Sequence, residues 1–89
     1  MAASGRPAQV RDFAPDEIEF VVKDPNSAAG ECQSFHRVSG GTPGWIVNGD
    51  PLSSRAEGAL QHRGPGEAAV FIDDDTLDAL IAARAAQAR

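Results

Sequence analysis

Apolar and polar residues alternate early in the chain, which is the pattern of a half-buried β-strand. The segment E-I-E-F-V-V-K begins at Glu17 and places Ile18, Phe20 and Val22 on one face, with the charged side chains mostly on the other. Pro25 follows directly after Lys-Asp, and a proline there favours a turn. The pattern therefore predicts a first strand over residues 17–23 that ends in a loop.

Two further segments with strand character flank a turn rich in glycine and proline. The first runs from Cys32 to Val38, and neither of its faces is plainly apolar, which indicates cover on both sides. The second runs from Trp45 to Asn48 and carries large apolar groups in both alternating sets. The residues between them, S-G-G-T-P-G, predict a β-hairpin whose loop is longer than two residues.

The second half of the chain predicts a short helix and one more strand. The segment from Ser53 to Arg63 is consistent with a short helix capped by a serine, although Gly58 weakens it by up to about 1 kcal/mol relative to alanine. A G-P-G sequence then breaks the chain. The segment E-A-A-V-F-I, from Glu67 to Ile72, predicts a fourth strand.

The last segment, Asp73 to Gln87, has the strongest helix pattern. Its D-D-D start supplies an N-cap and further carboxylates for the positive first turn. Leu77, Leu80 and Ile81 recur at helical spacing, so we expect them to form the buried part of this helix.

Together these elements predict an α+β fold, a small antiparallel sheet of about four strands with the C-terminal helix packed on it. The composition of residues 1–15 is typical of a flexible N-terminal tail. Residues 16–85 then form a single β-rich domain, and residues 86–89 are expected to fray.

The chain has 89 residues and one cysteine, so no intrachain disulfide can form. A folding unit of about 70 residues buries only about 60% of the surface that its unfolded chain exposes, which leaves it marginally stable. Self-association is a common way to enlarge such a core, so a homodimer is favoured.

Charge and hydropathy exclude several function classes. The net charge is −5, from 13 acidic and 8 basic residues, and the basic residues form no run. Such a chain does not attract a phosphate backbone, so we expect no direct nucleic-acid binding. The first residues lack the apolar stretch of a secretory signal, and no long apolar run spans a membrane. We therefore expect a cytoplasmic protein.

The chain offers few residues for catalysis or metal binding. Cys32 and His36 lie about 13 Å apart if they occupy one extended strand, which is too far to share an ion or a proton. His62 is the only other histidine, and a zinc site needs about four ligands. We therefore predict no catalytic, cofactor or metal site, and no enzyme activity.

An apolar contact surface is the remaining candidate site. The Trp-Ile-Val run has large side chains on both faces of its strand, and tryptophan is enriched in the energetically important parts of interfaces. The expected partner or dimer surface consists of Phe35, Trp45, Ile46, Val47 and Phe71.

Several short sequence motifs occur along the chain in an order that resembles a known family. They are V-K-D-P from Val22, Cys32 with His36-Arg37, W-x-V-N-G from Trp45, and P-G-E-x-A-V-x-I from Pro65. This order is similar to that of small actinobacterial proteins of the BldB type, over roughly residues 20 to 80. A looser likeness links the chain to the short actinobacterial domains classed as DUF397. The resemblance would place proline after the cysteine, where this chain has Gln33.

The resemblance implies a non-enzymatic regulator of development or secondary metabolism that self-associates. It further implies that the protein binds a helix-turn-helix transcriptional regulator rather than DNA. Two alternatives stay open at this point. One is an antitoxin-like partner in a two-gene cassette, and the other is a small ligand-binding or metal-binding domain that uses Cys32, His36 and His62.

Overall fold

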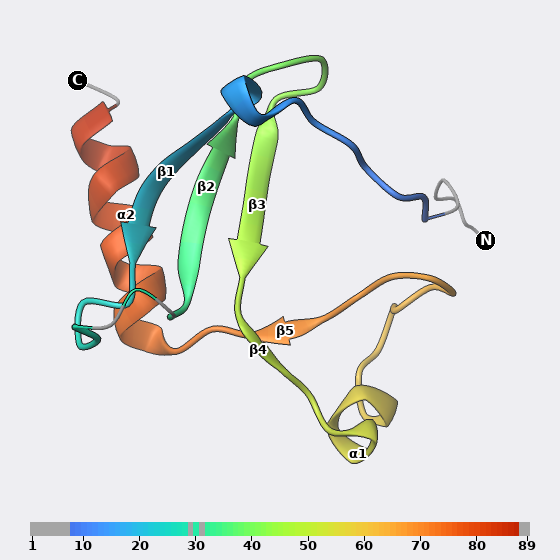
Figure 1. The fold of residues 1–89 in the computed structure, drawn as a ribbon. Coiled ribbons are helices and arrows are strands. Elements are labelled where there is room, and N and C mark those ends of the chain that lie inside the picture. The colour runs from blue at the N-terminus through green and yellow to red at the C-terminus, as the bar shows by residue number, and fades with distance from the viewer. Residues whose placement is uncertain (1–7, 29, 31, 88–89) are drawn as a thin grey trace.

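The fold is α+β, as the sequence predicts, and consists of a three-stranded antiparallel sheet, a two-stranded sheet and a long C-terminal helix (Figure 1). It is seen in a computed structural model that describes residues 8–28, 30 and 32–87. The elements in chain order are a single-turn 3-10 helix η1 (Pro15–Glu17), β1 (Ile18–Lys23), β2 (Ser34–Val38), β3 (Gly44–Asn48), β4 (Asp50–Pro51), α1 (Ser54–Gly58), β5 (Val70–Phe71) and α2 (Asp74–Gln87).

Strand β1 forms where the alternating pattern predicts it, but its alternation is interrupted. Phe20 pairs with His36 and Val22 pairs with Phe35, so the register shifts by one residue at Val21. Because successive residues of β2 point to opposite faces, Phe20 and Val22 also lie on opposite faces. The expectation that Ile18, Phe20 and Val22 share one face is therefore wrong, and the bulge is the reason.

The predicted hairpin is confirmed. Strands β2 and β3 pair antiparallel with Phe35 opposite Val47 and Arg37 opposite Trp45. The connection spans residues 39–43, and Gly41 within it has a φ of +57°, a conformation that side chains with a Cβ rarely adopt. The strand order β1-β2-β3 makes β2 the central strand and β3 an edge strand.

The fourth strand does not join the main sheet, which is a correction to the single sheet of about four strands. Strand β5 pairs with β4, a two-residue segment that follows β3 after Gly49. The chain reaches β4 through Gly49, where a Cβ atom would lie 2.6 Å from the carbonyl oxygen of Phe71. The missing side chain at this residue lets the two segments approach closely enough to pair.

Both helices begin at the kind of residue that the sequence predicts. The hydroxyl of Ser53 accepts a hydrogen bond from the backbone N–H of Ala56 at the start of α1. In α2 the carboxylate of Asp73 accepts from the N–H of Thr76 at 2.8 Å, and the Asp73 carbonyl accepts from Leu77. Asp73 is thus the N-cap of α2. The helix continues to Gln87, where the predicted helical segment ends.

The buried face of α2 is not the predicted one. Leu77 and Ile81 are 44% and 58% exposed, while Thr76 is fully buried and Leu80 is half-buried. The small residues Ala79 and Ala83 are also half-buried, so the helix rests on its less bulky side against β1 (Figure 1). The hydrogen bond from the Asp73 N–H to Gln33 ties the first turn to another part of the fold, with Thr76 buried, and Leu77 and Ile81 lie outside the buried side.

The core of the single chain is small. Phe35 and Val38, both on β2, are the buried apolar residues of the described part of the chain. Among the same described residues, eight large apolar side chains are exposed: Val10, Phe20, Val47, Leu60, Val70, Phe71, Leu77 and Ile81. Within residues 8–28, 30 and 32–87, no helix has both the length and the apolar character needed to cross a bilayer.

Candidate protein interface

Trp45, Ile46 and Val47, which we call the β3 surface, lie on the edge strand of the main sheet. Trp45 and Val47 project from the face that α2 covers in part, and Ile46 projects from the opposite face. Trp45 and Ile46 are half-buried, and Val47 is 41% exposed. Because α2 packs mainly against β1, at the other edge of the sheet, it leaves this strand partly uncovered (Figure 1).

Two guanidinium groups lie over the Trp45 ring. The Arg37 Cζ atom, from the neighbouring strand, is 5.3 Å from the ring centroid, and the Arg84 Cζ atom, from α2, is 5.5 Å away. Arg37 also donates a hydrogen bond to the Gly44 carbonyl at 2.9 Å. Each cation–π contact contributes about 0.5–1 kcal/mol at an exposed site. These contacts hold the indole in place and join the end of α2 to β3.

The other two residues of the expected surface lie elsewhere. Phe35 is 5% exposed and belongs to the core. It is therefore not part of the contact surface. Phe71 is 52% exposed, but it lies on β5 in the two-stranded sheet, beyond the end of β3. The structure thus keeps three of the five expected residues on one strand.

The face of the sheet opposite α2 carries a second apolar row. Phe20, His36 and Ile46 are cross-strand neighbours on this face, and the Phe20 and His36 rings meet edge to face with centroids 5.7 Å apart. Phe20 is 55% exposed. In Figure 1 neither α1 nor α2 lies over this face of the sheet. The edge strand therefore has apolar neighbours on both faces of the sheet.

Gln33 is a structural residue that the sequence reasoning missed. Its side chain is 7% exposed and donates to the Asp50 carboxylate at 3.1 Å and to the Phe71 carbonyl at 3.3 Å. Its amide oxygen accepts from the N–H of Asp73 at 3.0 Å. One side chain thus links β4, β5 and the start of α2. No pattern in the sequence around Gln33 indicates this role.

The three residues considered for metal or ligand binding do not come together. Cys32 and His36 line one hollow of about 520 Å³, beside Asp50 and the end of β3. His62 lines a different hollow. Among the residues that the structure describes, no three histidine, cysteine, aspartate or glutamate side chains are grouped so that they could hold a metal ion.

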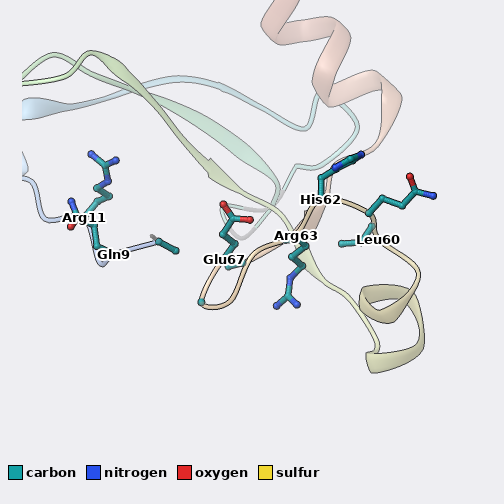
Figure 2. Close-up of a pocket in the computed structure, with 11 residues that line it drawn as sticks. Gln9, Arg11, Leu60, His62, Arg63 and Glu67 are labelled. Atoms are coloured by element: carbon teal, nitrogen blue, oxygen red, sulfur yellow. The ribbon is translucent and has the colours of Figure 1, made fainter. Parts of the chain in front are cut away.

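The hollow that contains His62 is a wide, open space of about 870 Å³ between the N-terminal segment and the loop before β5. Figure 2 shows Gln9 and Arg11 on one side, Leu60 and His62 on the other, and Glu67 between them. Their side chains point in different directions and present no convergent polar groups. Convergent polar groups are what a small-molecule site uses to orient its ligand, so this hollow gives no support to a ligand site.

In comparisons with known proteins, no protein-family model, no curated protein and no solved structure matches the chain.

Proposed function

We propose that this chain is a non-enzymatic regulatory protein that acts through protein contacts, first with a second copy of itself and then with a transcriptional regulator. The observation that carries the proposal is the contrast between its core and its surface. Two large apolar residues are buried in the described chain, while eight are exposed. A chain with this distribution gains stability by covering apolar surface against a partner.

The kind of protein partner is inferred from the sequence motifs whose order resembles that of BldB-type proteins. We propose a helix-turn-helix regulator of actinobacterial development or secondary metabolism as that partner. The acidic charge of −5 supports contact with the regulator rather than with DNA, because a phosphate backbone repels a chain of this charge. A cytoplasmic location is part of the same proposal, since the regulator acts there.

The test is direct binding between purified proteins. The tagged chain is first used to recover partners from an actinobacterial host, and a recovered helix-turn-helix protein is then titrated against the purified chain by calorimetry. We expect saturable binding, and we expect labelled operator DNA to bind the regulator but not this chain alone. Direct binding of the chain to DNA would contradict the proposal.

The antitoxin alternative is an outcome of the same experiment. If the recovered partner arrests growth when expressed alone, and co-expression of this chain restores growth, the chain neutralises a toxin. That outcome would replace the regulatory proposal while leaving the interaction surface intact.

A further inference from the structure

We infer that the free edge of β3 pairs with β3 of a second copy, antiparallel and around a twofold axis at Ile46. The two sheets, of three strands each, then become one continuous sheet. This inference rests on the proposed function, because it assigns a surface to the dimer proposed there.

Hydrogen bonds at the ends of β2 show which backbone groups face the free edge. The Gln33 carbonyl accepts from the N–H of Asp24, and the Ser39 N–H donates to the carbonyl of Glu17, so both groups point toward β1 and its flanking residues. Backbone groups alternate in direction along a strand, so the N–H and C=O groups of Ser34, His36 and Val38 point toward β3.

The direction of these groups fixes the direction of the groups on β3. Val38, His36 and Ser34 lie opposite Gly44, Ile46 and Asn48, so these β3 residues bond back to β2. The N–H and C=O groups of the residues in between, Trp45 and Val47, therefore point away from the sheet. Within the part of the chain that the structure describes, β3 has a neighbouring strand on one side only, and these groups form its free edge.

The two edges of the sheet differ in a way that favours pairing at β3. Strand β1 has a register shift at Val21, charged residues at Glu19 and Lys23, and the helix α2 packed against it. Bulges, charges and covering helices are the features by which proteins block edge-to-edge pairing. Strand β3 pairs with β2 without a register shift, and its sequence G-W-I-V-N contains no charge and no proline.

The sequence of β3 is also complementary to itself. Around an axis at Ile46, Trp45 of one copy lies opposite Val47 of the other, and each such pair exchanges two backbone hydrogen bonds. The two Ile46 residues lie opposite each other at a position without backbone hydrogen bonds, where Cα atoms are about 4.5 Å apart. Each pair joins apolar side chains, and no like charges face each other.

The surface area of the chain supports a second copy as the occupant. The accessible surface is 6818 Å², whereas a compact monomer of 9.3 kDa exposes about 5,000 Å². The extended residues 8–14 account for part of this excess. The full excess, about 1,800 Å², is larger than the area of about 800 Å² that one partner buries in a standard interface. The exposed Val47 and the half-buried Trp45 and Ile46 are the side chains that this pairing would cover.

The first arm of the test is sedimentation of the unmodified chain, and the second is a disulfide at the twofold axis. In a Cys32→Ala background, Ile46→Cys brings two thiols to a Cα separation that suits a disulfide. We expect a covalent dimer under mild oxidation. The matched control is Glu19→Cys in the same background, an exposed residue on the other edge strand. This control should stay monomeric under denaturing conditions without reductant.

A backbone variant provides an independent measurement. Val47→Pro removes an N–H that points away from β2, so the fold should persist, as judged by circular dichroism. The dimer loses two hydrogen bonds, and its dissociation constant should rise about tenfold or more. Ile46→Pro removes an N–H that bonds to β2 and should unfold the sheet instead.

The outcomes separate this inference from the proposed function. A dimer in sedimentation with no Ile46 cross-link, or with an equal cross-link at Glu19, overturns the β3 pairing and leaves the proposed dimer standing. An unchanged dissociation constant for a folded Val47→Pro variant overturns the pairing as well. A monomer at every concentration overturns both. Regulator binding is measured separately, so its failure would count against the proposed function alone.

Discussion

At the scale of single residues, two buried polar side chains differ in whether their polar atoms have hydrogen-bond partners. Gln33 uses both ends of its amide in hydrogen bonds to three segments. Thr76 is fully buried on α2, and its hydroxyl has no hydrogen-bond partner among the described residues. A satisfied buried group fixes a fold, whereas an unsatisfied one costs free energy of folding.

Replacing Gln33 by leucine should lower the free energy of unfolding by about 2–4 kcal/mol, because the N–H of Asp73 and the carbonyl of Phe71 lose their partner inside the protein. Urea unfolding followed by circular dichroism measures the change. The control is Gln61→Leu, an exposed glutamine, which should shift stability by no more than about 0.5 kcal/mol. Equal effects of the two substitutions would contradict the role of Gln33.

At Thr76, by contrast, we expect a substitution that raises the free energy of unfolding. Thr76→Val keeps the shape of the side chain and removes the unpaired hydroxyl, so the free energy of unfolding should rise by up to about 1 kcal/mol. The same substitution at Thr42, an exposed residue of the hairpin loop, should change little. Thermal unfolding of the two variants tests this, and a destabilised Thr76→Val protein would show that the hydroxyl has a partner.

At the scale of elements, the rotation of α2 is the feature that distinguishes the structure from the sequence pattern. The pattern favours Leu77, Leu80 and Ile81 as the buried side, but the helix buries Thr76 and half-buries Leu80. Asp73 caps the helix and donates its N–H to Gln33, so the first turn is tied to the segment before β2.

A matched pair of substitutions tests this rotation. Leu80→Ala should lower the free energy of unfolding by about 1–2 kcal/mol, because Leu80 is half-buried against the sheet. Ile81→Ala removes a side chain that is 58% exposed and should cost about 0.5 kcal/mol or less. A larger cost at Ile81 than at Leu80 in the monomer would show that the helix is turned as the sequence pattern predicts.

At the scale of the whole molecule, the chain is more open than its size requires. The radius of gyration is 14.9 Å, whereas a compact domain of this length has about 12 Å. The two-stranded sheet, α1 and the N-terminal segment extend from the main sheet, as Figure 1 shows. Stability that depends on association should then depend on concentration.

We expect the melting temperature to rise with protein concentration. For a chain that unfolds as a dimer, each tenfold increase adds about 1.4 kcal/mol per mole of dimer, which corresponds to about 3–5 °C because both chains contribute to the entropy of unfolding. Scanning calorimetry between about 5 and 500 μM measures the shift. A melting temperature that does not change over this range would mean that the single chain holds its fold without a partner.

The sequence by itself determined the local elements of this protein. Alternation, proline, glycine and capping residues act over a few residues, so they were sufficient to predict β1, the hairpin of β2 and β3, a serine cap for α1 and an aspartate cap for α2. The Trp-Ile-Val run of the candidate surface was predicted for the same reason, because its apolar character is local to one strand.

The tertiary structure decided how those elements face one another. The bulge at Val21, the pairing of β5 with β4 and the outward turn of Leu77 depend on contacts between residues far apart in the chain. Gln33 illustrates the reason, since it contacts partners 17, 38 and 40 residues away. A local pattern contains no information about such partners, so the burial of Phe35 and the free edge of β3 became visible only in the folded chain.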